Sequence, residues 1–305
     1  MTLTDRLGAV APKVWLRVSI AVAVLTIGLK TLAWWITGSV GLLSDAMESI
    51  VNLASAAFAL LMVHVAQQPP DAEHPYGHHK AEYFSAAFEG LAIIVAALAI
   101  MAAAAQRFVH PQGLEQLGWG LVLSVLSSAI NGALAWGMLQ SARVHRSMAV
   151  EGDARHLITD VWTSAGVVVG IALVALTDWV WLDPIVAIGV ALNILREGSN
   201  LVWESSQGLM DKRVEHVVQA EIDSVLRTFE DPAIRFDHIT TRRSGRRRYL
   251  DMHMHLPATW TLRRAAEARG SVEQALMNAV PGLRASIQLL PSDVEARFDE
   301  QEDLA

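Results

Sequence analysis

The sequence predicts a polytopic α-helical membrane protein, with six transmembrane helices followed by a small cytosolic α+β domain. Hydrophobic residues make up 52% of the 305 residues, and the mean hydropathy is +0.33. Several apolar runs reach about twenty residues, the length that an α-helix needs to cross a bilayer. Of the 24 Lys and Arg residues, 10 lie before residue 207 and 14 after it. This uneven distribution indicates that the last third of the chain is a soluble domain.

The six spans are expected at residues 14–37, 41–66, 82–108, 117–139, 156–176 and 179–203. They form a membrane domain over residues 1–206. A polar loop, residues 67–80, joins the second and third spans, and a polar linker, residues 140–155, joins the fourth and fifth. Most Lys and Arg at the span ends lie on one side of the bundle, which by the positive-inside tendency is the cytosolic side. Both termini are then cytosolic. The protein is expected in the cell membrane, which is the inner membrane if the source is bacterial.

The pattern changes after Asp211 to short amphipathic elements. Residues 213–229 have helical spacing, and RFDHITTRRSG and RRRYLDMHMHLP alternate like a hairpin around a Ser-Gly turn. The basic run 246–248 is expected to be a solvated part of that turn, with contact to anionic lipid as the alternative. A second helix over residues 262–278 and the strand LRASIQLLP complete the order α-β-β-α-β. This order predicts a ferredoxin-like domain over residues 207–292, followed by a frayed acidic tail, residues 293–305.

Polar side chains interrupt two of the apolar spans at helical spacing. Asp45, Glu48 and Asn52 are spaced i, i+3 and i+7 on the second span, and His156 and Asp160 are spaced i and i+4 on the fifth. Ionisable groups within a membrane are costly and usually mark an ion pathway. Two pairs at i and i+4, Glu48 with Asn52 and His156 with Asp160, can place four ligands around one divalent cation. The alternative is that these groups only form hydrogen bonds between helices.

The ligand types restrict the metal. Imidazole nitrogen with carboxylate and amide oxygens suits Zn, Fe, Mn, Co or Ni better than Cu(I), which prefers sulfur, and the chain has no Cys. Metal binds to neutral imidazole and ionised carboxylate, so protonation of His156 and Asp160 would release it. The ordinary pKa of imidazole, about 6.5, makes such coupling effective near neutral pH.

Two further groups have alternative interpretations. Glu82 and Glu89 are spaced i and i+7 on the third span; Glu89 either lines a cation path or pairs with a buried polar group such as Asn131. Alternation places Asp251, His253 and His255 on one face of a strand, which predicts either a metal site or a polar surface that faces a second protomer.

Five features, in this order along nearly the whole chain, resemble the cation diffusion facilitator family. They are TGSVGLLSDAMESIVN, the loop ending HPYGHHKAE, HLITDVWTS, LDPIVAI and the αββαβ pattern. The resemblance implies a homodimer of six-span protomers that exports a divalent transition metal in exchange for protons. It assigns the membrane metal ligands to Glu48, Asn52, His156 and Asp160, and matches Asp45 to an acidic position one turn earlier.

The resemblance also implies sites outside the bilayer. Asp71, His74 and His78 match a metal site in the loop, for which a solvated loop is the alternative. Lys80 and Asp211 match a charged pair that locks the dimer.

In the cytosolic domain, His253 matches one metal ligand of the family, and Asp237 lies where another ligand is often His. Ala266, Gln288 and Leu290 occupy positions that bind metal in some members, so a full two-metal site is not expected.

Three function classes fit these features: a metal/proton antiporter, and as alternatives a membrane metal sensor or a metalloenzyme without transport. The sequence offers no separate nucleophile or general base for catalysis, so we expect no enzyme. The expected partners are the bilayer, divalent cations, protons and a second copy of the chain. The net charge of −7 gives no reason to expect nucleic acid binding. No cofactor is expected besides the transported metal, which the loop and cytosolic sites would also bind.

Overall fold

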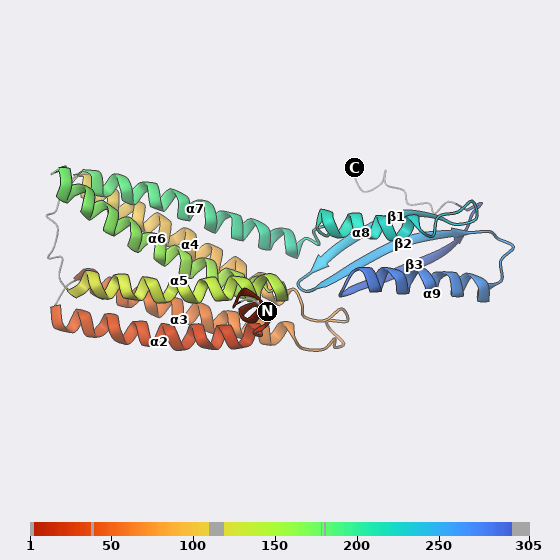
Figure 1. Cartoon of the computed structure of the whole chain (residues 1–305), viewed down its shortest axis with the longest axis horizontal. Helices are drawn as coiled ribbons and strands as arrows, with labels where there is room; N and C mark the ends of the chain where they lie inside the picture. The colour runs from red at the N-terminus through yellow and green to blue at the C-terminus, as the bar shows by residue number, and fades with distance from the viewer. Residues whose placement is uncertain (1–2, 38–39, 110–118, 178, 180, 295–305) are drawn as a thin grey trace. The chain divides into compact units, whose positions relative to one another are not determined.

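The computed structural model describes residues 3–37, 40–109, 119–177, 179 and 181–294 (Figure 1). The chain forms two compact units, Met1–Leu209 and Met210–Ala305. The division lies three residues after the boundary expected from the sequence. Most of the tail expected at residues 293–305 lies outside the described residues, so its frayed state stays a prediction.

In the described part of the first unit, six long helices follow one short helix. The helices are α1 (Leu3–Ala9), α2 (Pro12–Thr37), α3 (Val40–Ala66), α4 (Ala81–Val109), α5 (Trp119–His145), α6 (Met148–Thr177) and α7 (Leu182–Leu209). The six long helices have 26 to 30 residues each. At about 1.5 Å per residue, each exceeds the roughly 30 Å of a hydrocarbon core. Within the described residues, Pro12–Leu29, Ala81–Gln106 and Pro184–Leu209 are the stretches apolar enough to qualify as spans by themselves.

The linker predicted between the fourth and fifth spans is wrong. α5 continues to His145 and α6 begins at Met148, so a tight turn at Arg146, with φ 53°, and Ser147 replaces residues 140–155. Glu151 and Arg155, one turn apart on α6, form an ion pair of 2.7 Å that supports the helix beyond its apolar part. α7 likewise continues to Leu209, past the expected end of the sixth span at residue 203. An apolar run marks only the part of a helix that suits contact with lipid. The helix itself can extend beyond that run, which is why the predicted spans were too short.

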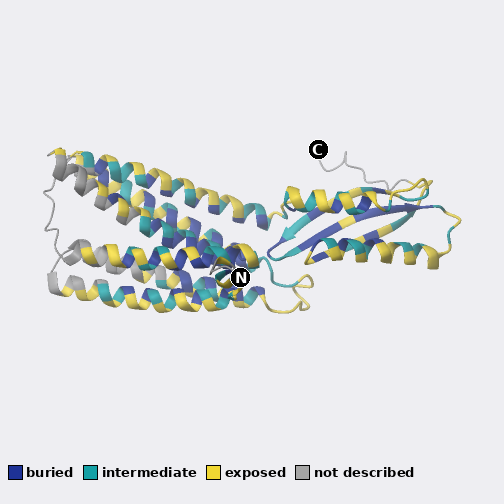
Figure 2. Ribbon diagram, in the orientation of Figure 1, coloured by how far each residue is buried: buried dark blue, intermediate teal, exposed yellow. Residues whose placement is uncertain are grey.

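Glycine brings α4 and α7 together. A Cβ atom on Gly90 would lie 2.7 Å from Val202 Cγ2, and one on Gly198 would lie 2.9 Å from the Gly90 carbonyl oxygen. Small residues at such crossings allow close backbone contact in membrane helices. α4, α6 and α7 contact one another pairwise, and α3 contacts both α4 and α6. Buried residues follow the inward sides of the helices (Figure 2), and exposed apolar side chains such as Val95 suit contact with lipid.

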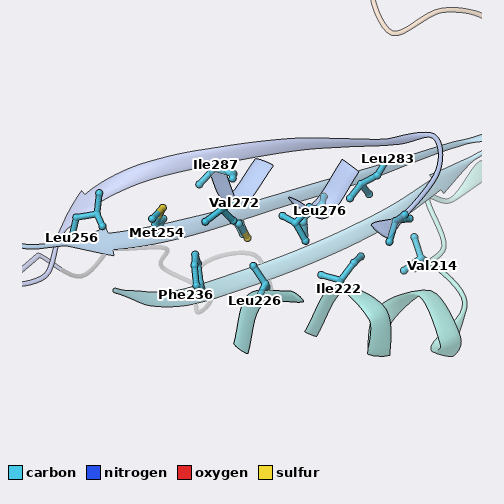
Figure 3. Close-up of a cluster of buried hydrophobic side chains, with 13 residues drawn as sticks. Val214, Ile222, Leu226, Phe236, Met254, Leu256, Val272, Leu276, Leu283 and Ile287 are labelled. Carbon is cyan, nitrogen blue, oxygen red and sulfur yellow. The ribbon is translucent and has the colours of Figure 1, made fainter. Parts of the chain in front are cut away.

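The second unit has the predicted order of elements. They are α8 (His216–Arg227), β1 (Arg235–Ser244), β2 (Arg247–Leu256), α9 (Leu262–Ala279) and β3 (Leu283–Pro291). The strand order is β1-β2-β3, with β2 antiparallel to β1 and parallel to β3. Apolar side chains from both helices and all three strands meet in one core, which includes Ile222, Met254 and Leu276 (Figure 3). The second unit therefore has a hydrophobic core of its own.

The basic run at the hairpin is not a solvated turn throughout, as the sequence suggested. Arg248 is buried, and its Nη2 donates to Glu215 Oε2 at 3.1 Å. Arg243 Nη1 donates to the other Glu215 oxygen, also at 3.1 Å. Burial acts to raise the pKa of Glu215, but a backbone N–H and the charges of Arg248 and Arg243 outweigh it and leave the pKa below its ordinary value. The buried guanidinium of Arg248 is paired with the Glu215 carboxylate, so this ion pair is part of the folded structure of the second unit.

Candidate metal sites

The fifth-span pair of the predicted membrane site lies inside the first unit. His156 and Asp160 are one turn apart on α6, and His156 is only 4% exposed. Asp160 Oδ2 accepts a 3.5 Å contact from Asn131 Nδ2 on α5. An imidazole and a carboxylate therefore share one face of a helix in the bundle interior.

The second-span residues lie on α3, which contacts α6. The side chains of Asp45, Glu48 and Asn52 fall outside the described residues. The four-ligand arrangement of Glu48, Asn52, His156 and Asp160 therefore stays a prediction.

Two buried carboxylates accompany His156. Glu89 on α4 is 0% exposed, and its Oε2 lies 3.5 Å from His156 Nδ1. Asp153, one turn before His156, is also buried and interacts electrostatically with it. The sequence singled out Glu89 because it lies seven residues after Glu82 on the third span. The partner suggested there for Glu89, Asn131, donates to Asp160 instead. Asp153 was missed, although it occupies the i−3 position from His156 on the same helix.

The loop before α4 gathers its three predicted ligands. Asp71 Oδ1 lies 3.3 Å from His74 Nδ1, and Asp71 Oδ2 lies 3.4 Å from His78 Nε2. The loop is organised by Asp71, whose Oδ1 accepts the backbone N–H of His74 at 2.6 Å and of Glu73 at 3.0 Å. Gly77, with φ 85°, supplies the left-handed turn that brings His78 back.

These three residues fit a metal ion chemically. One ligand atom from each lies within 4.8 Å of the others, and bonds of 2.0–2.1 Å to a tetrahedral ion would place neighbouring ligand atoms about 3.3 Å apart. The backbone N–H of His74 holds the pKa of Asp71 below its ordinary value. The carboxylate is therefore ionised, as a ligand must be, over the physiological range.

A second cluster lies on the sheet of the second unit. Asp237 on β1 lies opposite His253 on β2, with 3.2 Å between Asp237 Oδ1 and His253 Nδ1. Its other oxygen, Oδ2, lies 2.8 Å from His255 Nε2. One ligand atom from each of the three lies within 4.8 Å of the others. Both histidines are buried, on the face opposite Met252 and Met254.

His255 is the member of this cluster that the resemblance did not assign. Alternation along β2 was the available signal, because it placed residues 253 and 255 on one face. Its Nδ1 lies 3.4 Å from the Pro291 carbonyl oxygen, which can accept the Nδ1 proton. Nε2, which contacts Asp237 in the structure, would then bind a metal after losing its own proton. A β-bulge between Asp237 and Thr240, with His238 at φ 49°, bends β1 beside the cluster.

Electrostatics favour an ionised Asp237. Partial burial acts to raise its pKa, but the hydrogen bond and charge of His255 and the charge of Arg235 outweigh it. The pKa of Asp237 is therefore lower than its ordinary value. The pairing of β2 with β3 places Gln288 beside His253 and Leu290 beside His255, so two positions that bind metal in some members carry an amide and an apolar group here.

The residues of the predicted dimer lock each have a contact within their own unit. Lys80 Nζ donates to the Leu209 carbonyl at 3.0 Å. Asp211 Oδ1 accepts from Arg242 Nη1 at 3.2 Å. A pair between Lys80 and Asp211 stays a prediction.

The fold is that of a helical membrane protein, and groups of side chains that could hold a metal ion lie in its loop and in its second unit. The model of the cation efflux transmembrane domain matches residues 16–210, and that of the cation efflux protein cytoplasmic domain matches residues 214–292. The chain belongs to the cation efflux family, also called the cation diffusion facilitators. The resemblance is thereby confirmed, as is the fold class of a helical membrane domain followed by an α+β domain. The family is one of transporters that export cations, and the protein is integral to the membrane.

Relatives extend over most of the chain. An uncharacterized transporter of Synechocystis sp. is 42% identical, covering 90% of this chain and 88% of its own. The cation-efflux pump FieF of Klebsiella pneumoniae is 30% identical, covering 87% and 88%. A solved structure of a putative zinc transporter, CzrB, is 26% identical and covers 26% of this chain and 96% of its own, with a TM-score of 0.24.

Proposed function

We propose that this protein exports a divalent transition-metal cation from the cytosol in exchange for protons. The observation that carries the proposal is the pair of buried His156 and half-buried Asp160, one turn apart on one face of α6 in the transmembrane domain. A titratable imidazole next to a carboxylate is costly in a membrane interior unless it serves ion movement. Glu48 and Asn52 on α3 would complete the site.

Proton coupling follows from the ligand chemistry. A cation binds when the imidazole of His156 is neutral and the Asp160 carboxylate is ionised. Protonation of these two groups removes the lone pair and the negative charge that hold the cation. A site that faces the two sides of the membrane alternately would then exchange cation for proton.

The proposed substrate is Zn, Fe, Mn, Co or Ni. One imidazole with three oxygen ligands is a mixed donor set that these ions share. Asn52 offers a neutral oxygen where a carboxylate would add a charge, so the site holds a dication with two carboxylates, Glu48 and Asp160. For a given set of ligands, affinity follows the Irving–Williams order of the divalent metals, whatever the protein. Ligand geometry must therefore decide which of these metals the site selects.

Two resident metal sites belong to the same proposal. Asp71 with His74 and His78 would bind one ion in the cytosolic loop, and Asp237 with His253 and His255 another in the second unit. Carboxylate and imidazole donors at these separations suit Zn²⁺ and similar ions. A metal at each position would fix the loop and the sheet edge.

We also propose that the protein is a homodimer in a cell membrane, the inner membrane if the source is bacterial. Both termini would lie in the cytosol in this arrangement, because the second unit matches a cytoplasmic domain and an even number of spans returns the N-terminus to the same side. Lys80 and Asp211 would form the charged lock between the protomers.

The test is cation uptake into sealed proteoliposomes with an acidic lumen. Wild type should accumulate Zn²⁺ or Co²⁺, and the accumulation should fall when the pH gradient is collapsed. His156→Ala should lose this uptake. His64→Ala changes a histidine that is exposed near the end of α3, and it should transport like wild type.

Two results would contradict the proposal. Uptake by His156→Ala with unchanged pH dependence would remove the coupling role. Cation binding by the wild type without accumulation in the lumen would favour a sensor.

A further inference from the structure

We propose that Glu89 is a positioning residue of the transport site. Its carboxylate holds the Nδ1 side of His156, so that Nε2 is the nitrogen that binds the transported cation. This inference rests on the proposed function, because it concerns the same imidazole. It assigns a role to a buried acid of α4 that the four-ligand site leaves unused.

The contact itself is close and buried. Glu89 Oε2 lies 3.5 Å from His156 Nδ1, and the two side chains are 0% and 6% exposed. A neutral imidazole carries one N–H and one lone pair. If Nδ1 donates its N–H to the Glu89 carboxylate, Nε2 keeps the lone pair. Partners of this kind fix the tautomer and ring orientation of a metal-binding histidine and raise its basicity.

The backbone of α6 is shaped to admit Glu89. Gly152 lies one turn before His156, and a Cβ atom there would lie 3.3 Å from both Cβ and Cγ of Glu89 and 3.2 Å from the Ala86 Cα. Such contacts are tighter than ordinary packing, so the absence of a side chain at Gly152 lets the stem of Glu89 lie against α6. The helix crossing therefore positions the carboxylate at the ring of His156.

The charged residues buried around Glu89 indicate the role of its carboxylate. Among the described residues buried in the first unit are Glu82, Glu89 and Asp153, and none is Lys or Arg. The 3.5 Å contact of Glu89 Oε2 with His156 Nδ1 lacks good hydrogen-bond geometry in the structure, so we expect it to tighten to a hydrogen bond when a cation binds Nε2. A buried carboxylate with no Lys or Arg beside it is costly, and a cation-bound imidazole offsets that cost. The buried charge of Glu89 is therefore less costly when the site holds a cation than when it is empty.

The test measures the affinity of the membrane site for Co²⁺ by equilibrium dialysis of the full-length protein in detergent. His74→Ala and His253→Ala are present throughout to remove the loop and cytosolic sites. Glu89→Met removes the acceptor at similar size, and Glu89→Gln keeps a carbonyl oxygen that accepts from Nδ1. The matched control is Glu82→Gln on the same helix, because buried Glu82 accepts instead from Ser147 Oγ.

Glu89→Met should raise the dissociation constant by about 10- to 100-fold, the usual loss for such partners. Glu89→Gln should lose less, and Glu82→Gln should bind like the parent. Gly152→Ala, which keeps both side chains but displaces the Glu89 stem, should weaken binding in the same direction. In a His156→Ala background, Glu89→Met should cause no further loss, because its effect passes through the imidazole.

Each contrary result has a distinct meaning. Parent-like affinity in Glu89→Met and Glu89→Gln would overturn the positioning role while His156-dependent binding remained. An equal loss with and without His156 would also overturn it, because Glu89 would then be a ligand itself. Parent protein whose Co²⁺ binding does not depend on His156 would instead overturn the proposed transport site.

Discussion

Asp237 shows how a single carboxylate organises a site from residues on two strands. Its two oxygens contact different histidines, His253 directly opposite and His255 two residues further along β2. The same contacts that would hold a metal also stabilise the metal-free sheet, because the carboxylate is paired in the folded state. Folding and metal binding therefore share these residues.

Asp237 should make the stability of the second unit sensitive to acid. Its folded pKa is below the ordinary 3.8, so its contribution is present above that value and is lost as the pH falls through the lower, folded pKa. The stability advantage of wild type over Asp237→Asn should therefore be larger at about pH 5 than at about pH 3. Thermal unfolding of metal-free protein in detergent measures this difference. Asp251→Asn, an exposed change on the same sheet, is the control, and an equal pH effect there would contradict the assignment.

At the scale of elements, the membrane unit depends on close crossings of α4. Gly90 and Gly198 allow α4 and α7 to touch, and Gly152 allows α4 to lie against α6. Helices in lipid gain little from the hydrophobic effect, so tight packing and hydrogen bonds must hold them together. The same crossings bring Glu89 to His156, which links the packing of α4 to the candidate transport site.

Gly198→Ala should destabilise the membrane unit, because its Cβ would lie 2.9 Å from both the Gly90 carbonyl oxygen and Ile93 Cγ2. Overpacking of this kind costs about 1–3 kcal/mol. Gly189→Ala is the matched control on the same helix, since a Cβ there meets nothing within 4 Å. Thermal unfolding in detergent, followed by tryptophan fluorescence, should show a lower midpoint for Gly198→Ala alone. Equal midpoints for the two variants would show that the crossing tolerates a side chain.

At the scale of the whole molecule, two units with separate cores share one chain. The second unit has its own apolar core and matches the cytoplasmic domain of the family over residues 214–292. The first unit contains the candidate transport site. This separation suits the proposed arrangement, in which the first unit transports the cation and the second unit joins the two protomers.

Deleting the residues after Asp211 should weaken the proposed dimer without unfolding the membrane helices. The expected result is a shift toward monomer in detergent, measured as molar mass by light scattering, because the main proposed contact between protomers is removed. Deleting only residues 295–305 is the control and should leave the mass unchanged. A stable dimer of the longer truncation would place the interface within the first unit.

The sequence by itself determined the elements and the shared helix face of one pair of candidate ligands. Apolar runs, a spacing of four residues and strand alternation are local signals, and they predicted the six long helices, the αββαβ order and the shared helix face of His156 and Asp160. The same alternation placed His253 and His255 on one face of β2. Such patterns are visible because each depends only on neighbours along the chain.

Only the tertiary structure decided which distant residues meet. The contact of Glu89 with His156 depends on how closely α4 approaches α6, which Gly152 permits. The joining of Asp237 to His255 depends on strand register and a bulge, and the burial of Arg248 beside Glu215 depends on how the start of α8 lies against the hairpin. Spacing within a segment carries no information about the distance between segments, because packing of the whole fold sets that distance.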